Sequence, residues 1–433
     1  MKIAILGFGL EGKSAYEYWQ SSENEITICD QDELIDLPDK TSSQLGTSYL
    51  TGLDKFDLIV RSPAIHPSHI VEANDQNILQ KVTTVTNEFL RICPSRNTIA
   101  ITGTKGKGTT ATLVAKMLEA DGKRVHLGGN IGWPALDLLK NNIQPEDYIV
   151  LELSSFQLID LQYSPHIGVC LMVVPEHLDW HADNNEYITA KTRLFSHQLS
   201  SDIAIYFADN ETSRRIATSG EAKAIPYFAQ PGAFVEKNDL KIDGQLICHL
   251  NELKLLGEHN RQNACAALTV VWQVTQDKET ARSVLSTFSG LEHRLEFVRQ
   301  LDGVKYYDDS FGTTPETAMV AIQAFNQPKV VILGGSDKKA SYDQLAKVVQ
   351  SSNVRSVVLI GLMAPKIQAA LSSIGFSDFV SGGPTMPEVV RTARVQAQVG
   401  DVILLSTACA SFDMFKNYKD RGDQFKKAVL ALA

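Results

Sequence analysis

The sequence predicts an α/β protein of three domains, on three observations. Short apolar runs alternate with segments of helical length, and several runs are apolar throughout, as are strands of parallel sheets covered on both faces. The length of 433 residues suits about three domains of roughly 150 residues. The pattern is interrupted at 93–97 (CPSRN) and at Ser289-Gly290, so the predicted domains are 1–92, 93–290 and 291–433.

The first predicted domain begins with a strand–helix–strand unit. Residues 2–7 are a short apolar run, Gly7 to Gly12 opens a helix with the spacing GxGxxG, and a second strand at 25–29 ends at Asp30. A third run ends at Ser62, at the carboxyl edge of the sheet, where such folds bind ligands. Asp30 follows Gly12 at close to the spacing that binds a ribose, so a dehydrogenase that binds NAD stays open at this point.

The second and third predicted domains continue the alternation. A parallel sheet in the second domain is predicted from strands at 98–102, 148–153, 167–174 and 203–207. Between about 223 and 256, Asn238-Asp239 and Asp243-Gly244 separate short alternating segments, which predicts antiparallel hairpins before a helix at 260–275. The third domain has continuous apolar runs at 329–333, 357–360 and 402–405.

Composition and charge exclude several classes of protein. With 41 basic and 50 acidic residues the net charge is −9, so general binding to nucleic acid or to a membrane surface is not expected. The six cysteines show no CxxC spacing and lie mostly in apolar runs, which predicts reduced, buried thiols. The first apolar stretch is too short for a signal peptide and no window approaches 18 apolar residues, so we expect a cytoplasmic protein.

The strongest local signal is ITGTKGKGTT at 101–110, which follows a buried strand and opens an amphipathic helix. Glycines let backbone N–H groups close around phosphate oxygens, a lysine can reach the terminal phosphates, and a threonine hydroxyl can bind Mg²⁺. The pattern predicts a site for a nucleoside triphosphate, and an incidental turn before a helix is the alternative. The candidate residues are Gly103, Thr104, Lys105, Gly106, Lys107, Gly108, Thr109 and Thr110.

Three charged positions downstream could serve the same site. Glu152 is a lone carboxylate inside an apolar strand, where a metal ion or a neighbouring basic side chain would offset the cost of burial. His177 and His181 are spaced i and i+4, which on a helix would face one way. Without further ligands nearby they do not make a zinc site, so we expect one to contact Mg²⁺ or phosphate and His181 to be structural. Lys191, taken alone, is typical of a solvated helical lysine.

Taken together, these motifs resemble those of the Mur ligases, ATP-dependent enzymes that form amides in peptidoglycan assembly. The resemblance runs the whole length of the chain, and LELSSFQL and ACASFDMFKNY are typical of the branch that adds D-glutamate. It rests on ITGTKGKGTT (101–110), GGNIG (128–132), LELSSFQL (151–158), AKTRLF (190–195), GEHNRQNA (257–264), LEHRLE (291–296), DDS (308–310), LGGSDKK (333–339) and STACASFDMFKNYKDRGDQF (406–425).

The resemblance implies an architecture and a catalytic site. The N-terminal domain would be Rossmann-like and bind the UDP-linked substrate. The central domain would be a P-loop ATPase domain with a parallel sheet and small antiparallel hairpins, and the C-terminal domain would be Rossmann-like and bind the amino acid. Lys107, Thr109 and Glu152 would hold the ATP phosphates and one Mg²⁺. A second Mg²⁺ would lie at His177 and Lys191, and this lysine is carbamylated by CO₂ in the family. The resemblance therefore replaces the interpretation of Lys191 as a solvated lysine, because a carbamate is an oxygen ligand suited to a hard metal.

The resemblance also implies the remaining ligand contacts. ATP would further contact Asn260, Asn263, Arg294 and Asp309. The UDP end of the substrate would contact Phe8, Gly9, Leu10, Glu11, Gly12, Asp30 and Ser62, and its muramoyl-alanine part Asn130, Ser154 and Gln157. D-Glutamate would contact Thr313, Lys338, Ser411 and Tyr418.

The implied reaction joins D-glutamate to UDP-N-acetylmuramoyl-L-alanine through an acyl phosphate and releases ADP and phosphate, and the protein is expected to be a monomer. Phe311 stands where the family has a lysine beside the amino-acid pocket, so we expect D-glutamate to be used with a raised KM. Two alternatives are a folylpolyglutamate-type ligase, which the GxGxxG domain disfavours, and a nucleotide-binding subunit without turnover, which Glu152, His177 and Lys191 together disfavour.

Overall fold

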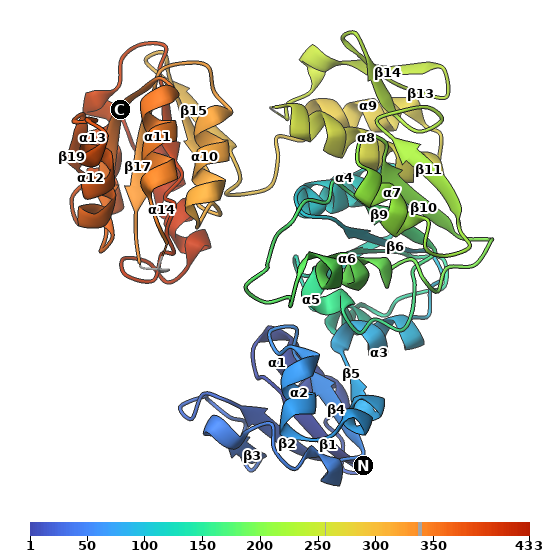
Figure 1. Cartoon of the computed structure of the whole chain (residues 1–433). Coiled ribbons are helices and arrows are strands. Elements are labelled where there is room, and N and C mark those ends of the chain that lie inside the picture. Colours follow the sequence, from blue (N-terminus) through green and yellow to red (C-terminus); the bar gives the residue numbers. More distant parts are fainter. Residues whose placement is uncertain (256, 337–339) are drawn as a thin grey trace. The chain divides into compact units, whose positions relative to one another are not determined.

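The computed structural model describes residues 1–255, 257–336 and 340–433. They form two compact units, one of residues 1–254 with 258–288, the other of residues 289–433 with Leu255 and Gly257. Each unit consists of sheets covered by helices (Figure 1), so the α/β class predicted from the sequence is confirmed. Among the described residues, none of the helices has both the length and the apolar character needed to cross a bilayer.

The N-terminal sheet of the first unit is parallel and has the strand order β3-β2-β1-β4-β5. Side chains on β1 alternate between two cores, with Ile3 and Ile5 in one and Ala4 and Leu6 in the other, which is why this run is apolar throughout. Its elements are β1 (Lys2–Leu6), α1 (Leu10–Trp19), β2 (Glu25–Asp30), β3 (Ser42–Leu45), η1 (Gly46–Ser48), η2 (Leu53–Lys55), β4 (Leu58–Arg61), α2 (Pro67–Ala73), η3 (Gln76–Lys81), β5 (Val82–Thr83) and α3 (Val85–Ile92).

The central sheet of the same unit is also parallel, in the order β11-β10-β9-β6-β8-β7. Because β6 lies between β8 and β9, the loop after β6 meets the carboxyl ends of both neighbours. Its strands and helices are β6 (Thr98–Thr102), α4 (Lys107–Ala120), β7 (Val125–Gly129), η4 (Ala135–Asn141), β8 (Tyr148–Glu152), α5 (Ser155–Leu158), β9 (Ile167–Cys170), α6 (Asn184–Thr192), β10 (Ile203–Phe207), α7 (Glu211–Ala217) and β11 (Lys223–Tyr227).

The segment after β11 forms a small antiparallel sheet in the order β12-β13-β14 and then two helices. The hairpins predicted for 223–256 are present from residue 234, but the prediction is wrong for β11, which pairs in parallel with β10 and extends the central sheet. The elements are β12 (Phe234–Glu236), β13 (Asp239–Ile242), β14 (Gln245–His249), η5 (Leu250–Glu252), α8 (Glu258–Trp272) and α9 (Lys278–Thr287).

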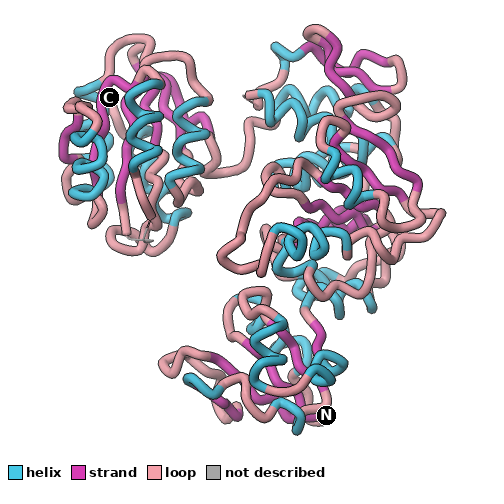
Figure 2. The backbone as a smooth tube through the Cα atoms, viewed as in Figure 1, coloured by secondary structure: helices cyan, strands magenta, loops and turns pink. Residues whose placement is uncertain are grey.

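The second unit is a sheet in the order β15-β16-β20-β17-β18-β19, with helices on both faces (Figure 2). All neighbours are parallel except β15 and β16, an antiparallel edge pair that the sequence pattern did not predict. Val331 packs on one core and Val330 on the other. The elements are β15 (Glu296–Leu301), β16 (Val304–Asp308), α10 (Pro315–Gln323), β17 (Lys329–Gly334), α11 (Asp343–Ser351), β18 (Val354–Ile360), α12 (Ala364–Ser373), β19 (Phe379–Ser381), α13 (Met386–Gln396), β20 (Val402–Leu405) and α14 (Tyr418–Leu430).

Candidate active site

The glycine-rich loop of the central sheet joins the end of β6 to the start of α4. Gly103 and Gly106 have positive φ values of +144° and +89°. A Cβ at Gly103 would lie 2.6 Å from Leu171 Cβ, and one at Gly106 would overlap Asn263 Oδ1, so both positions require glycine. The loop leads into a 14-residue helix whose first N–H groups point toward it, the usual arrangement for binding phosphate.

Lys107 is the first residue of α4, and its side chain lies over this loop. Its Nζ donates to the carbonyl oxygens of Gly103 at 3.2 Å and Thr104 at 3.0 Å. Thr109 and Thr110 follow in the first turn of the helix and are buried, whereas Lys105 is exposed. The cation is therefore held where the predicted phosphates would bind.

Helix α8 brings two asparagines to the loop. Thr110 Oγ1 donates to Asn263 Oδ1 at 3.4 Å, and Asn263 Nδ2 donates to Asn260 Oδ1 at 3.1 Å. Both asparagines were predicted to bind ATP, and the structure places them beside the loop although they lie about 150 residues further along the chain.

Glu152 ends β8 next to the loop and is 5% exposed. Asn130 Nδ2 donates to Glu152 Oε2 at 3.2 Å, and Asn130 N–H donates to the Glu152 carbonyl at 2.8 Å. Among the described residues, Glu152 forms no ion pair. The alternative in which a basic side chain offsets its burial is therefore not supported. Asn130 and Glu152, predicted for different ligands, lie together.

Lys191 extends from α6 into the interior and is 1% exposed, so the reading of this residue as a solvated helical lysine is wrong. Its Nζ donates to the Gly103 carbonyl at 3.0 Å and to Thr102 Oγ1 at 3.4 Å, and lies 4.5 Å from the centroid of the Tyr187 ring. Burial, and after it the positive charge of Lys107, lower the pKa of Lys191 to about 7. A large fraction of this amine is therefore neutral at neutral pH.

His177 and His181 lie in a turn, not on a helix, so they do not share a helical face as the i, i+4 spacing suggested. His177 has a φ of 58°, and its carbonyl accepts N–H groups from Trp180 and His181. The His177 ring is half-exposed and packs 4.8 Å from the ring of Phe156. Burial lowers the pKa of His177, and the positive charge of Lys107 lowers it as well. Both effects favour the neutral imidazole, which is the form that can act as a ligand.

Apart from Asn130, which lies beside Glu152, the predicted contacts to the UDP-linked substrate lie around the N-terminal loop and α5. Phe8 N–H donates to Asp30 Oδ2 at 2.7 Å. Ser154 caps α5 in a capping box with Gln157, whose Nε2 donates to Glu11 Oε1 at 2.6 Å. Burial raises the pKa of Glu11 to about 7. Ser62 packs near Gly7, at the start of the loop between β1 and α1. The predicted residues of this segment are Phe8, Gly9, Leu10, Glu11 and Gly12.

In the second unit, Tyr418 is the first residue of α14. The other predicted residues described there lie on loops: Arg294, Asp309, Thr313 and Ser411. Arg294 lies over the ring of Phe311, 3.7 Å from guanidinium carbon to ring centroid, and that ring packs edge-on against Tyr418. Burial raises the pKa of Asp309 to about 7, although Ser406 Oγ donates to it at 2.6 Å. Lys338, predicted to bind D-glutamate, lies outside the described residues.

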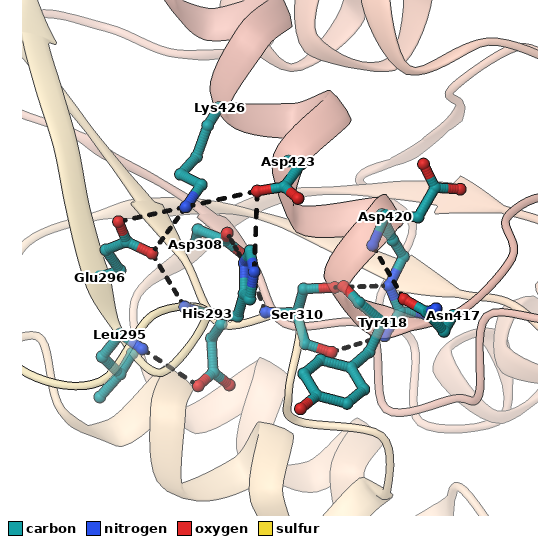
Figure 3. A network of polar contacts seen from close by, with 12 residues as sticks. His293, Leu295, Glu296, Asp308, Ser310, Asn417, Tyr418, Asp420, Asp423 and Lys426 are labelled. Carbon is teal, nitrogen blue, oxygen red and sulfur yellow. Dashed lines mark hydrogen bonds and ion pairs between the residues drawn. The ribbon is translucent and has the colours of Figure 1, made fainter. Parts of the chain in front are cut away.

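A polar network holds these loops together (Figure 3). His293 Nδ1 lies 2.7 Å from Asp308 Oδ2, Lys426 contacts Glu296 at 3.3 Å, and Ser310 Oγ donates to the Tyr418 carbonyl at 2.8 Å. Buried Arg421 also donates to the Oγ and carbonyl of Ser310. No role was predicted for Arg421, although its position one turn after Tyr418 on the same helix was the available signal.

Two groups of side chains within the described residues have the spacing of metal ligands, His66 with His181 and Glu186, and His293 with Glu296 and Asp308. The predicted metal residues Thr109, Glu152, His177 and Lys191 do not form a group of this kind, because only Glu152 is a carboxylate and only His177 is an imidazole. They offer enough oxygen ligands for a hard metal ion only if Lys191 carries a carbamate.

Sequence comparison identifies the family. The chain is 35% identical over 446 aligned residues to the UDP-N-acetylmuramoylalanine–D-glutamate ligase of Clostridium kluyveri, an alignment that covers 99% of this chain and 96% of that protein. The chain belongs to the Mur ligase family. The model of the Mur ligase middle domain matches residues 101–271, and that of the Mur ligase glutamate ligase domain matches 293–409.

Solved Mur ligases share the fold. The UDP-N-acetylmuramate–alanine ligase MurC of Thermotoga maritima aligns with a TM-score of 0.59 at 17% identity, covering 100% of this chain and 99% of that one. MurF of Thermotoga maritima, solved in complex with ADP, aligns with a TM-score of 0.58 at 17% identity, covering 87% of this chain and 90% of that one. The resemblance to Mur ligases predicted from the motifs is confirmed. The predicted domain boundaries and the roles of individual residues stay predictions.

Proposed function

We propose that this chain is an ATP-dependent ligase that joins the amino group of D-glutamate to the alanyl carboxylate of UDP-N-acetylmuramoyl-L-alanine in peptidoglycan precursor synthesis. The observation that carries the proposal is the match to a D-glutamate ligase over 99% of this chain. The loop at 103–108 would supply the phosphate site that the reaction needs, and the position of Lys107 Nζ over this loop supports that role.

The proposed reaction has two steps. The alanyl carboxylate attacks the γ-phosphorus of ATP and releases ADP, which leaves an acyl phosphate. The D-glutamate amine then attacks the acyl carbon, the C–O bond to phosphate breaks, and the amine loses a proton. Positioning and charge neutralisation are most of what a protein contributes to phosphoryl transfer, and Lys107 would neutralise charge on the transferring group.

The oxygen donors at the loop fit a hard divalent cation. Thr109 and Glu152 would hold Mg²⁺, which supplies neutralising charge when bound, and the amide of Asn130 orients the Glu152 carboxylate. His177 would serve a second Mg²⁺. Asn260 and Asn263 would contact the adenine side.

The environment of Lys191 supports its carbamylation. CO₂ reacts with a neutral amine, forming an N–C bond with loss of one proton, and burial supplies that neutral amine by lowering the pKa of Lys191 to about 7. The carbamate replaces a cation beside Lys107 with an anion, which removes the repulsion between the two lysines. The two carbamate oxygens would serve the second Mg²⁺.

The amino-acid pocket would be formed by Thr313, Ser411 and Tyr418 with Lys338. Phe311, at the position of the family lysine, packs against both Arg294 and Tyr418. The proposed pocket would therefore have one cation fewer and an aromatic wall in its place. We therefore expect D-glutamate to be the substrate with a raised KM. Action as a monomer in the cytoplasm stays a prediction.

The deciding experiment measures phosphate release from ATP with UDP-N-acetylmuramoyl-L-alanine and a panel of amino acids. We expect release to require both the UDP-linked substrate and D-glutamate. Faster turnover with a neutral or basic amino acid would overturn the D-glutamate assignment. Release with a folate in place of the UDP-linked substrate would favour a folylpolyglutamate-type ligase, and ATP binding without release under any combination would favour a non-catalytic subunit.

A further inference from the structure

His181 is completely buried beside the turn that carries His177, and none of the proposed chemistry uses it. Its Nε2 lies 2.9 Å from Ser155 Oγ and its Nδ1 lies 3.3 Å from Glu186 Oε2. Ser155 begins α5, three residues after Glu152, and Glu186 is on α6, which also carries Lys191. One imidazole therefore joins α5, which begins three residues after Glu152, to α6, which carries Lys191.

Glu186 extends this link to the N-terminal domain. The same oxygen, Oε2, accepts the Ala182 N–H at 2.9 Å and lies 3.1 Å from His66 Nε2. His66 Nδ1 accepts the N–H of Ser68 at the start of α2, so the His66 proton is on Nε2 and is donated to Glu186. With its proton on Nε2, His66 offers no lone pair to a metal ion, so we interpret the group of His66, His181 and Glu186 as a hydrogen-bonded link.

The turn that carries His177 also contacts the segment that includes Ala64 and His66. Trp180 Nε1 donates to the Ala64 carbonyl at 3.2 Å, and the Trp180 ring packs 4.5 Å from the rings of both His66 and Phe156. The His177 carbonyl accepts the N–H groups of Trp180 and His181, which ties the strained φ of His177 to the position of these two side chains.

Ser155, His181 and Glu186 follow the order of a hydrolytic triad, yet this arrangement cannot act as one. Ser155 is 2% exposed and lies in the first turn of α5, so a substrate carbonyl has no access to its Oγ. The hydrogen bonds among these three side chains therefore hold the segments in position and do not catalyse a reaction.

We propose that His181 is a positioning residue that fixes the His177 turn against α5 and α6 and, through Glu186 and His66, against the segment that follows β4. This inference rests on the proposed function, in which His177 serves a Mg²⁺. Loss of the His181 hydrogen bonds frees the turn and displaces the His177 imidazole while leaving Lys107 and the glycine-rich loop in place.

The test compares His181→Phe, which keeps an aromatic ring but removes both hydrogen bonds, with His126→Phe. His126 is a matched control because it is also buried and also paired with a carboxylate, Asp147, at 2.9 Å, but lies on β7 away from the turn. We expect His181→Phe to raise the Mg²⁺ concentration for half-maximal activity about tenfold with unchanged KM for ATP, and His126→Phe to leave it unchanged. A purely structural role would lower the melting temperature and kcat in both variants without moving the Mg²⁺ dependence.

A binding measurement separates this inference from the proposed function. Calorimetry of ADP binding with and without Mg²⁺ needs no turnover, and we expect Mg²⁺ to strengthen ADP binding less in His181→Phe than in the wild type. Ser155→Ala, the milder variant, should shift the dependence in the same direction by about threefold. Equal Mg²⁺ enhancement in wild type, His181→Phe and Ser155→Ala would overturn the inference, whereas a wild type without D-glutamate-dependent phosphate release would overturn the proposed function instead.

Discussion

The first unit contains two loops with the same strand–turn–helix arrangement and different charged side chains. In each, a parallel strand ends in a glycine-rich turn and a helix begins, at β1 and α1 in one case and at β6 and α4 in the other. The central loop has Lys107 bonded to its own carbonyls. The N-terminal loop has Glu11 bonded to Gln157 and an N–H group donated to Asp30.

This difference shows that the strand–turn–helix arrangement of such a loop does not by itself determine which ligand the loop suits. A cation over the loop suits a phosphoryl group that is being transferred, because charge develops there in the transition state. In the N-terminal loop Lys13 Nζ lies 6.0 Å from the centroid of the Phe8 ring, an arrangement that suits a diphosphate that is only held. Glu11 is compatible with such a ligand because burial raises the pKa of Glu11 to about 7 and reduces its negative charge. Four predictions, made with five substitutions, test this contrast.

The largest expected effect is that of Lys107→Ala. Removal of a charge worth about 3 to 5 kcal/mol in the transition state should lower kcat/KM by a hundredfold to a few thousandfold, without unfolding the protein. Phosphate release and thermal denaturation measure the two quantities. Lys116→Ala, on the exposed face of the same helix, is the control and should retain full activity. More than about a tenth of wild-type activity in Lys107→Ala would contradict the assignment of the loop.

The glycines of the two loops should differ in their tolerance of a side chain. A Cβ at Gly12 would overlap the Gly7 carbonyl, which is backbone, whereas a Cβ at Gly106 would overlap the end of the Asn263 side chain. We expect Gly12→Ala to lower the free energy of unfolding by about 3 kcal/mol and Gly106→Ala by about 1 to 2 kcal/mol, the latter mainly because alanine disfavours its positive φ. Urea denaturation checks both values, and equal losses would show that the N-terminal loop adapts.

The sequence predicted these loops well because each is contiguous. The glycines, Lys107 and the threonines of 103–110 lie next to one another, so local spacing was enough. Contacts between distant segments were not predictable from apolar runs, which identify strands but do not encode their order in the sheet. Lys191 reaches the Gly103 carbonyl across 88 residues and Gln157 reaches Glu11 across 146. The burial of Lys191, which decides its chemistry, therefore required the structure.

Glu11→Gln should stabilise the protein in a manner that depends on pH. The pKa of Glu11 rises from 4.5 to about 7 on folding, so its burial destabilises the folded protein progressively as pH rises through that range and fully above it. The glutamine removes this cost and its Oε1 can still accept from Gln157. We expect a gain of about 2 to 3 kcal/mol at pH 8 and almost none at pH 4.5, measured by denaturation at both values. A gain that is the same at the two pH values would show that Glu11 does not titrate on folding.

The smallest expected effect is that of Asp30→Asn at the other carboxylate of the N-terminal loop. Asp30 accepts the Phe8 N–H at 2.7 Å through Oδ2 and the Asp32 N–H at 2.9 Å through Oδ1. Asparagine keeps one acceptor oxygen and loses the charge, so the loop should be held more weakly by about 1 kcal/mol. Since the loop would bind the diphosphate and take no part in the phosphoryl transfer, KM for the UDP-linked substrate should rise about fivefold while kcat and KM for ATP stay unchanged. The two loops are independent if Asp30→Asn and Lys107→Ala change different kinetic constants, and an increased KM for ATP in Asp30→Asn would show that the N-terminal loop also influences the ATP site.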